Sequence, residues 1–295
     1  MRSLGSRVPR GPSADAPRPE LLQAGSPLSR RFRRRQRLGQ YRIEECVAVG
    51  GFAEVYKAYD TVEGIRVALK VPHPHLTDRE NLDAFRKEVR LVASLDHPAI
   101  LGIKTAGLVD GVFVVVSALA EETLADRLTR RISRKRALEV MGSLLDGLAY
   151  AHGRRVIHCD VKPENVLLFK GDRVRLADFG LARLALRTLD ASGSGTVGYM
   201  APEQALGRPS LRSDVFSLGM ILWRLMGGGL PAWPYRWPYD RLDRVRRGWS
   251  DEVIRIARRA TEVDEAKRYA DARALRAAFE RARPRALRGQ DEGRA

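Results

Sequence analysis

The pattern of apolar and polar positions divides the chain into two parts of different character. Between Tyr41 and Val116, short apolar runs with near-alternating polar positions predict β-strands, and glycine-containing turns separate them. The predicted strands cover residues 41–47, 54–59 and 66–71, a run near Gly107, and residues 112–116. Beyond Leu119 the apolar positions recur at helical spacing. A strand-rich segment of about 80 residues, followed by a helix-rich segment about twice as long, predicts two lobes with a cleft between them.

Two helices stand out in this pattern. Asp78 is a suitable N-cap for a helix in the strand-rich part, and the apolar positions on its face are Leu82, Phe85, Val89 and Val92. A longer helix is predicted over residues 136–152, and Gly153 is expected to end it. Its apolar positions are Leu138, Met141, Leu144, Leu145 and Leu148. This helix should form part of the core of the helical lobe.

The first 39 residues differ from the rest of the chain. Residues 1–39 are rich in Pro, Gly and Ser and lack apolar periodicity, which predicts a disordered tail. A dense basic cluster closes it, formed by Arg30, Arg31, Arg33, Arg34, Arg35 and Arg37. This cluster could bind an acidic partner or a membrane surface, but a solvated linker is the favoured interpretation. At the other end, residues 284–295 are expected to form a short polar tail.

The amino-acid composition bears on the cellular environment of the protein more than on its function. The formal charge is +17, yet an arginine-rich composition can reflect coding bias, so charge alone does not establish a nucleic-acid or membrane partner. Cys46 and Cys159 have no metal-type spacing and predict a reducing, cytoplasmic setting without a disulfide framework. His73 and His75 lack a nearby third ligand and are expected in a loop. The apolar run 112–120 is too short to span a bilayer, and no apolar segment follows the basic N-terminus as in a secretory signal.

Two features of the strand-rich part have weak chemical meaning when taken alone. Residues 47–55 contain small residues in a turn, which allows backbone N–H groups to approach phosphate oxygens, although such turns are more often plain hairpins. Lys70 lies near the end of an apolar strand and needs an anionic partner, for which Glu88 is suitable. By itself, this pair would be an ordinary structural ion pair.

The decisive stretch is His158-Cys-Asp-Val-Lys-Pro-Glu-Asn165, between the long helix and the apolar run 166–168. Asp160 can accept a hydroxyl proton, and Lys162 can neutralise a moving phosphoryl group. Asn165 can bind a metal ion, as can Asp178, which ends another predicted strand. Carboxylate, amide and phosphate oxygens are the ligands that Mg²⁺ prefers.

Taken in order, these motifs resemble the eukaryotic-type protein kinase superfamily, in particular its bacterial Ser/Thr branch. The motifs are the Gly-rich loop, Val67-Ala-Leu-Lys70, a helix Glu, the stretch 158–165, Asp178-Phe-Gly180 and Ala201-Pro-Glu203. The resemblance implies an α+β, bilobal fold over residues 40–283. A small antiparallel β-sheet lobe with one helix would cover residues 40–117, and a larger, mainly α-helical lobe residues 118–283. It also implies transfer of the γ-phosphoryl group of ATP, with Mg²⁺, to Ser or Thr hydroxyls of protein substrates.

The resemblance assigns a role to each matching residue. Asp160 corresponds to the catalytic base, Lys162 to the phosphate-neutralising Lys, and Asn165 and Asp178 to the Mg²⁺ ligands. Lys70 would pair with the α- and β-phosphates and be held by Glu88. The residues of the loop that would cover the phosphates are Val47, Ala48, Val49, Gly50, Gly51, Phe52, Ala53, Glu54 and Val55. The residues whose backbone would bind adenine include Ser117 and Leu119.

Three further residues have implied roles outside the chemistry itself. Thr196 resembles the substrate-proximal Thr of Ser/Thr kinases. Asp214 resembles the helix carboxylate that braces the catalytic loop. Arg268 resembles the Arg that pairs with Glu203.

The chain also departs from the family pattern. Ala48 and Ala53 replace two glycines of the loop; alanine can adopt ordinary backbone angles, so the loop should still form. Cys159 replaces an Arg that commonly binds a phosphorylated activation-loop residue, which requires guanidinium geometry. We therefore predict that phosphorylation is not an obligatory switch. The phosphorylation sites considered are Thr188, Ser192 and Ser194.

Other functions are open but less well supported. A catalytically weak pseudokinase scaffold is disfavoured because Lys70, Asp160 and the other motif residues are all present. A kinase of small molecules is disfavoured because the motif 201–203, after Gly195-Thr196, resembles the part that shapes a peptide-binding platform. A nucleic-acid binder acting through residues 1–39 is also disfavoured, and it would show a steep salt dependence.

Overall fold

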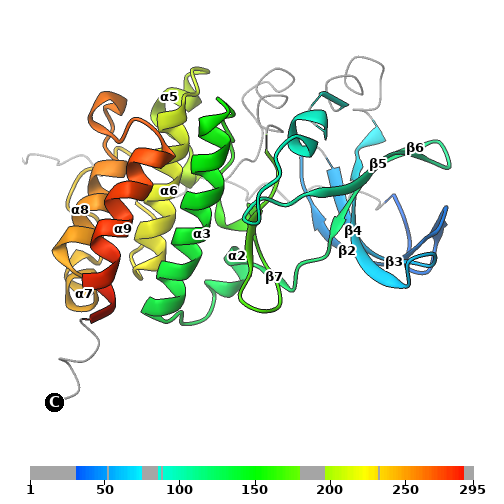
Figure 1. The fold of residues 1–295 in the computed structure, drawn as a ribbon, viewed down its shortest axis with the longest axis horizontal. Coiled ribbons are helices and arrows are strands. Elements are labelled where there is room, and N and C mark those ends of the chain that lie inside the picture. Colours follow the sequence, from blue (N-terminus) through cyan, green and yellow to red (C-terminus); the bar gives the residue numbers. More distant parts are fainter. Residues whose placement is uncertain are drawn as a thin grey trace, which may run out of the picture.

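The computed structural model describes residues 31–51, 53–74, 86–87, 89–179, 197–231 and 233–288. Figure 1 shows two lobes arranged along the long axis, a curled β-sheet on one side and a group of packed helices on the other. The predicted α+β, bilobal fold is therefore confirmed.

The first lobe is built on one antiparallel sheet with strand order β1-β2-β3-β4-β6-β5. Its strands are β1 (Arg37–Leu38), β2 (Tyr41–Val49), β3 (Ala53–Asp60), β4 (Ile65–Pro72), β5 (Ile103–Val109) and β6 (Val112–Ala118). All five strands that the alternating pattern predicts are present. Two tight turns need left-handed backbone, and glycine supplies it at Gly64 (φ +70°) between β3 and β4 and at Gly111 (φ +74°) between β5 and β6.

The sheet curls around an apolar interior of its own. The buried residues of this cluster are Phe32, Leu38, Tyr41, Ile43, Tyr56, Ala58, Val67, Leu69, Val71, Val114 and Val116. Across the β4–β6 pair, Leu69 lies opposite Val116 and Lys70 opposite Val115. Because side chains alternate along a strand, Lys70 projects from the face opposite to this cluster. The predicted helix after β4 is helical at residues 86–87 and 89–93, and residues 75–85 and 88 lie outside the described residues.

The end of the predicted tail is packed on the sheet. Residues 31–39 were expected to be disordered, but β1 pairs with β2, and Phe32 and Leu38 are buried in the cluster. The backbone N–H of Arg35 donates to Ile43 O (2.8 Å), and Ile43 N–H donates to Gln36 O (2.9 Å). Two apolar side chains among many arginines thus give this segment enough burial and backbone pairing to order it.

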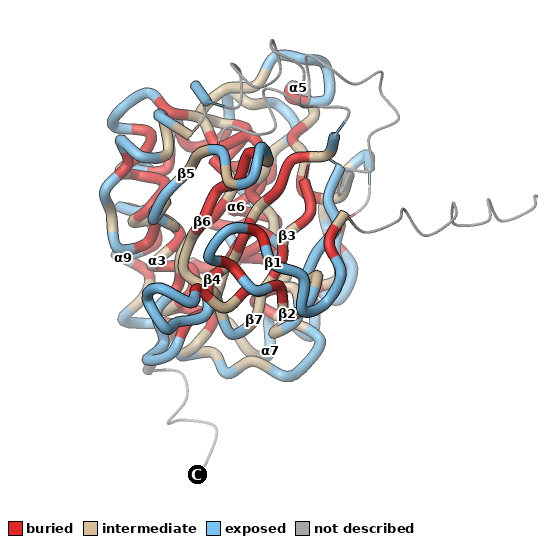
Figure 2. The backbone as a smooth tube through the Cα atoms, turned by 90° about the vertical axis from the view of Figure 1, so that its right-hand side faces the viewer, coloured by how far each residue is buried: buried red, intermediate tan, exposed pale blue. Residues whose placement is uncertain are grey.

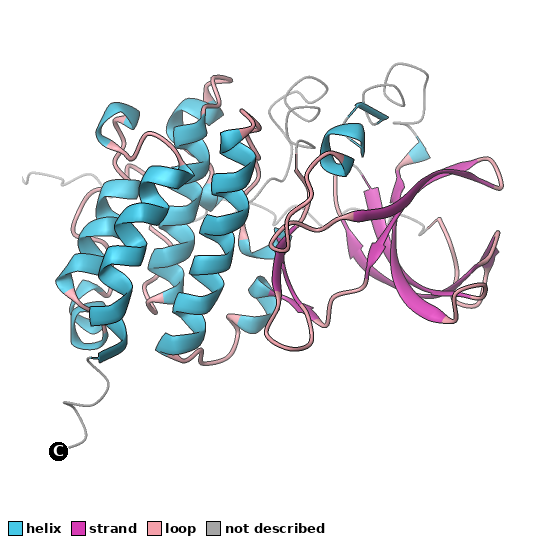
Figure 3. Cartoon of the chain, in the orientation of Figure 1, coloured by secondary structure: helices cyan, strands magenta, loops and turns pink. Residues whose placement is uncertain are grey.

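The second lobe consists of helices and a small sheet (Figure 3). The helices are α2 (Leu124–Arg127), α3 (Arg134–Gly153), α5 (Pro202–Ala205), α6 (Leu211–Leu225), α7 (Leu242–Gly248), α8 (Asp251–Ala260) and α9 (Ala272–Arg288). The sheet has the order β7-β8-β9, with β7 (Glu122–Thr123), β8 (Val166–Leu168) and β9 (Val174–Leu176). Ser133 caps α3 by accepting from Arg136 N–H, and the helix ends at Gly153 as the sequence predicts. Helix α9 continues to Arg288, past the expected domain end at residue 283.

Helices α3, α6 and α9 pack around the main core, which Figure 2 shows as buried backbone passing through the centre of the molecule. Helices α6 and α8 approach closely because Gly219 has no side chain: a Cβ there would lie 2.7 Å from that of Ala260. Among the described residues, no helix combines the length and apolar character needed to cross a membrane.

The aromatic segment after α6 divides into a half-buried and an exposed part. Tyr235 packs edge-on against Phe216 (ring centroids 5.2 Å apart), and Trp237 packs against Trp223 (5.7 Å). These two side chains therefore cover the core of the lobe. Trp233 is 66% exposed.

Candidate active site

The stretch 158–165 lies between α3 and β8 and holds three of the predicted catalytic groups together. The Lys162 ammonium lies 2.8 Å from Asp160 Oδ2, and Asn165 Nδ2 donates to the same oxygen at 2.9 Å. Asn165 Nδ2 also donates to the Asp160 carbonyl at 2.8 Å. Pro163–Asn165 form one turn of 3₁₀ helix, which turns the Asn165 side chain back towards Asp160. The carboxylate, the ammonium and the amide thus form one cluster.

The amide orientation in this cluster suits a metal site. Both hydrogens of Asn165 Nδ2 are used by Asp160, so the amide oxygen Oδ1 is the atom left to bind a cation. The cluster connects to Asp178 through the backbone, because Ala177 N–H donates to Asn165 O at 2.8 Å. A neutral amide oxygen and a carboxylate are hard ligands, and this donor set fits Mg²⁺.

Asp178 connects the two lobes. Its Oδ1 lies 2.6 Å from the Lys70 ammonium on β4, across 108 residues of sequence. Burial acts to raise the pKa of Asp178, but the charge and hydrogen bond of Lys70 outweigh it, so the pKa lies below its ordinary value of 3.8. Asp178 therefore stays ionised, as a metal ligand must.

A buried carboxylate supports the catalytic loop from behind. Asp214, at the start of α6, is 1% exposed and accepts from the backbone N–H groups of His158 (2.8 Å) and Cys159 (2.9 Å). It also accepts from His152 Nε2 at 2.9 Å. Because His152 Nδ1 accepts from Ala272 N–H (3.0 Å), the proton of this ring must be on Nε2. The bracing role that the resemblance gives to Asp214 therefore extends to α3 and α9.

His158 binds the segment that follows β9. Its Nε2 donates to the Ala177 carbonyl at 2.8 Å, one residue before Asp178, while Nδ1 accepts from Asp160 N–H at 3.2 Å. The ring also packs on Phe179 with centroids 4.5 Å apart. One buried imidazole thus fixes the spacing between Asp160 and Asp178.

Hydrogen bonds hold both the backbone N–H and the carbonyl of Cys159. Its φ is +67°, a left-handed conformation that is unusual for a residue with a side chain. Asp214 binds its N–H, and the buried Gln204 of α5 donates from Nε2 to its carbonyl. The residue before Asp160 is therefore tied to both α6 and α5.

The loop predicted to cover phosphates forms a tight connection between β2 and β3. Gly50 N–H donates to Ala53 O at 2.9 Å. Ala48 and Ala53 lie within these strands and have no positive φ, so neither alanine distorts the loop. Glu54 is buried, and Tyr56 Oη and Arg31 N–H both donate to its Oε2. Ser117 is the second-last residue of β6, and Leu119 follows that strand.

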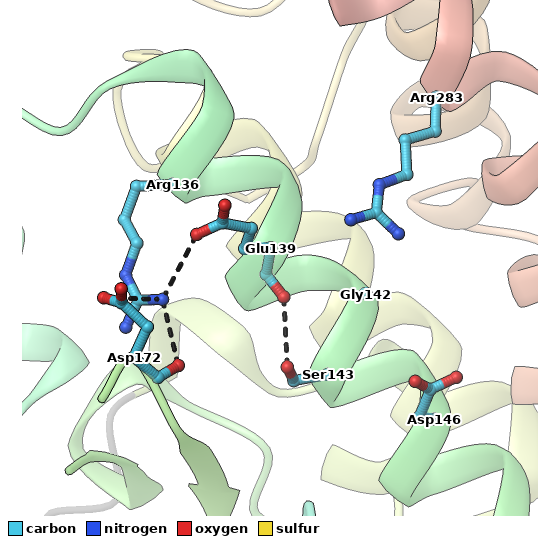
Figure 4. Close-up of a pocket in the computed structure, with 7 residues that line it drawn as sticks. All are labelled: Arg136, Glu139, Gly142, Ser143, Asp146, Asp172 and Arg283. Atoms are coloured by element: carbon cyan, nitrogen blue, oxygen red, sulfur yellow. Dashed lines mark hydrogen bonds and ion pairs between the residues drawn. The ribbon is translucent and has the colours of Figure 1, made fainter. Parts of the chain in front are cut away.

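A polar pocket of about 360 Å³ lies elsewhere, on the surface between α3, α9 and the turn before β9 (Figure 4). Arg136 bonds there to Glu139 (3.3 Å) and to the Asp172 carbonyl (3.0 Å). None of the predicted site residues lines it.

The protein kinase domain model matches residues 41–278. The chain belongs to the protein kinase family. Its curated relatives include the serine/threonine-protein kinase PrkC of Bacillus subtilis, 34% identical over 201 residues, which are 65% of this chain and 31% of PrkC. PknA of Mycobacterium tuberculosis is 35% identical over 206 residues, 65% of this chain and 48% of PknA. This kinase domain thus spans less than half of the length of these relatives.

Solved structures agree with the assignment. The Mycobacterium tuberculosis PknI kinase domain matches with a TM-score of 0.64 and 25% identity, over 85% of this chain and 99% of that one. The PpkA-294 apo form matches in fold, with a TM-score of 0.68 and 21% identity, over 84% and 99% of the two chains. The resemblance to the bacterial branch of the superfamily is therefore confirmed.

Some residues of the predicted motifs are not among those that the structure describes. Glu88 and Phe52 lie outside the described residues, as do Thr196 and the three candidate phosphorylation sites. The residues that the sequence interpretation missed are His152, His158, Gln204 and Phe32. His158 stands in the stretch 158–165 but has no role of its own in the sequence interpretation, and no motif marks the other three. Each acts through a contact with a segment that is distant in the sequence.

Proposed function

We propose that this kinase domain transfers the γ-phosphoryl group of ATP to Ser or Thr hydroxyls of protein substrates, with Asp160 as the base. The observation that carries the proposal is the arrangement around Asp160. Lys162 and Asn165 both bind its Oδ2, which leaves Oδ1 to accept the proton of an incoming hydroxyl.

Holding one oxygen fixed has a chemical purpose. The hydrogen bonds to Oδ2 fix the plane of the Asp160 carboxylate. Oδ1 is therefore already oriented to accept the proton when the hydroxyl binds. The ammonium of Lys162, 2.8 Å from Oδ2, would lie beside the transferred group and offset the negative charge on its oxygens. The proton would pass from the hydroxyl to Oδ1 as the hydroxyl oxygen attacks phosphorus, and ADP would leave.

The remaining roles follow the family. Lys70, which forms an ion pair with Asp178 in this structure, would bind the α- and β-phosphates, and the loop 47–55 would cover them. Asn165 Oδ1 and Asp178 would hold Mg²⁺, which supplies charge neutralisation for the phosphate oxygens. Backbone groups from Ser117 to Leu119 would bind adenine. Before the nucleotide binds, Lys70 pairs with Asp178, and this contact helps to lower the pKa of the Asp178 carboxyl.

Protein substrates with Ser or Thr acceptors are proposed from the names of the relatives and from Lys162. Activation without an obligatory activation-loop phosphate is proposed from Cys159, which offers no guanidinium to such a phosphate. The ties from Asp214 and Gln204 to Cys159 support this, because they hold the loop without a phosphate. A cytoplasmic setting is proposed from the cysteine content alone.

The test is label transfer from γ-³²P-ATP to casein or myelin basic protein by the purified full chain, followed by phosphoamino-acid analysis. We expect Mg²⁺-dependent label on Ser or Thr, and a loss of it in Asp178→Asn. If wild type binds ATP but labels neither itself nor an acceptor, the protein is a scaffold and the proposal is wrong. Label found on Tyr would contradict the assigned acceptor class.

A further inference from the structure

Residues 31–36, which we call the N-terminal clasp, pack on the first sheet. Arg31 and Phe32 lie against β3 and β4 next to the loop 47–55, and the rest of the clasp pairs with Ile43 of β2. Phe32 is 7% exposed, and its ring lies edge-on to Tyr56 with centroids 5.6 Å apart. Its backbone N–H donates to Tyr56 Oη at 3.1 Å. The clasp therefore binds the strand that leaves the loop through both an apolar and a polar contact.

Arg31 extends these contacts to a second strand. Its backbone N–H donates to Glu54 Oε2 at 3.2 Å, and its Nη1 donates to the Pro72 carbonyl at 3.2 Å. Pro72, the last residue of β4, is the partner of Ala53, the first residue of β3. The clasp thus joins the two strand ends at the root of the loop.

The position of Glu54 gives these contacts a consequence for nucleotide binding. Glu54 belongs to the loop that would cover the phosphates, and it lies opposite Val71, so its side chain is on the face of the sheet that carries Tyr56 and not on the face of Lys70. Here it is 4% exposed, and its Oε2 is bound by Tyr56 Oη and Arg31 N–H. The clasp supplies one of these donors directly and positions the other through Phe32.

The turn of the loop is held from the side of β4 as well. His73, directly after Pro72, makes a 2.7 Å hydrogen bond from Nε2 to the Gly50 carbonyl. Because a carbonyl can only accept, this nitrogen carries the proton. Arg31 binds the carbonyl of the preceding residue, so the clasp and the turn are connected through Pro72, the last residue of β4, and His73, which follows it.

We propose that the N-terminal clasp is part of the nucleotide-binding lobe and that Phe32 is a positioning residue, which sets the affinity for ATP by fixing the loop 47–55. The inference rests on the proposed function. It places a functional element before the matched family region, which begins at Tyr41. The clasp restricts the loop before ATP binds. The loop therefore loses less conformational entropy when it becomes ordered over the phosphates.

The experiment compares three variants of the full chain with wild type. Phe32→Ala removes the anchor, and Phe32→Leu keeps an apolar side chain there. Arg34→Ala is the control, since Arg34 is exposed and its side chain makes none of the contacts above in the described chain. The readouts are the dissociation constant of ATP by calorimetry, KM for ATP, KM for the protein acceptor, kcat, and the thermal unfolding midpoint.

We expect Phe32→Ala to weaken ATP binding and raise KM for ATP about tenfold, with acceptor KM and kcat nearly unchanged, because an interaction made before the transition state is lost. Phe32→Leu should recover most of this affinity, and Arg34→Ala should match wild type.

A lowered unfolding midpoint with unchanged ATP affinity in Phe32→Ala would show a purely structural role and overturn the inference. If Phe32→Ala does not fold, Tyr56→Phe replaces it, since this change removes only the hydroxyl between Phe32 and Glu54. Normal ATP affinity in folded Tyr56→Phe would equally overturn the inference. Failure of wild type to bind ATP would overturn the proposed function together with it.

Discussion

The guanidinium of Arg268 and the carboxylate of Glu203 form a buried two-point ion pair, with Nη1–Oε1 at 2.7 Å and Nη2–Oε2 at 2.9 Å. The other three N–H groups of Arg268 donate to the carbonyls of Arg212, Glu262 and Val263. All five donors of this side chain are therefore used. The pair joins α5, just after the activation-loop region, to the segment before α9.

Breaking this pair should strongly destabilise the second lobe. Arg268→Met leaves the Glu203 carboxylate buried without its cation and should lower the free energy of unfolding by about 3–5 kcal/mol. Arg268→Lys keeps the charge but loses the forked geometry, so its loss should be intermediate. Urea unfolding followed by circular dichroism measures both. Equal stability of Arg268→Met and wild type would show that the pair contributes nothing to the fold.

The same carboxylate should make stability depend on pH. Burial would raise the pKa of Glu203, but hydrogen bonds from Arg268 and Ser213 lower it below its ordinary value of 4.5. A carboxyl whose pKa is lowered on folding contributes fully above its unfolded pKa and loses that contribution as pH falls through the folded pKa. The stability difference between wild type and Glu203→Gln should therefore be largest above pH 4.5 and shrink in more acidic solution. Urea midpoints across this range measure it; a constant difference would contradict the assigned pKa shift.

Gln204 should affect catalysis through the residue beside the base. Gln204→Met keeps the volume but removes the donor to the Cys159 carbonyl, which relaxes the backbone next to Asp160. We expect kcat to fall about tenfold, with little change in KM for ATP. A fall of this size corresponds to the free energy of one lost buried hydrogen bond. Leu206→Ala is the control, since Leu206 directly follows α5, as its C-cap residue, but is 68% exposed. Equal kcat values for Gln204→Met and wild type would remove Gln204 from the positioning set.

Activation should survive the loss of the candidate phosphorylation sites. The combined change Thr188→Ala, Ser192→Ala and Ser194→Ala removes hydroxyls whose phosphates Cys159 could not bind in the manner of an Arg. Steady-state transfer to a protein acceptor should therefore stay within about threefold of wild type, because no strong ion pair is lost. Phosphatase-treated wild type serves as the matched control. Loss of activity in both samples would show that an activation-loop phosphate is required after all.

Most structural features that depend on the local sequence pattern could be predicted. Strands β2 to β6 and helix α3 follow directly from apolar periodicity, and the ends of α3 lie within two residues of the expected limits. The site residues on one short loop, Asp160, Lys162 and Asn165, also come together as their spacing suggests.

What the sequence did not predict depends on distant contacts. Phe32 lies in a stretch whose composition suggests disorder, and its packing on Tyr56, together with backbone pairing to β2, orders the stretch. His152 looks like an ordinary helix residue until Asp214 and Ala272 approach it from other helices. Nothing in single-residue spacing gives the tautomer of a ring or the partner of a carbonyl, because both depend on the tertiary fold.

The central claim is that Asp160 accepts the hydroxyl proton during phosphoryl transfer. Its most direct test is the single-turnover rate of γ-phosphoryl transfer at saturating ATP and protein acceptor, in wild type and in Asp160→Asn. The amide keeps the shape of the side chain but cannot take the proton, so the rate should fall about 10²–10⁴-fold while ATP binding is retained. Equal single-turnover rates for the two proteins would contradict the claim.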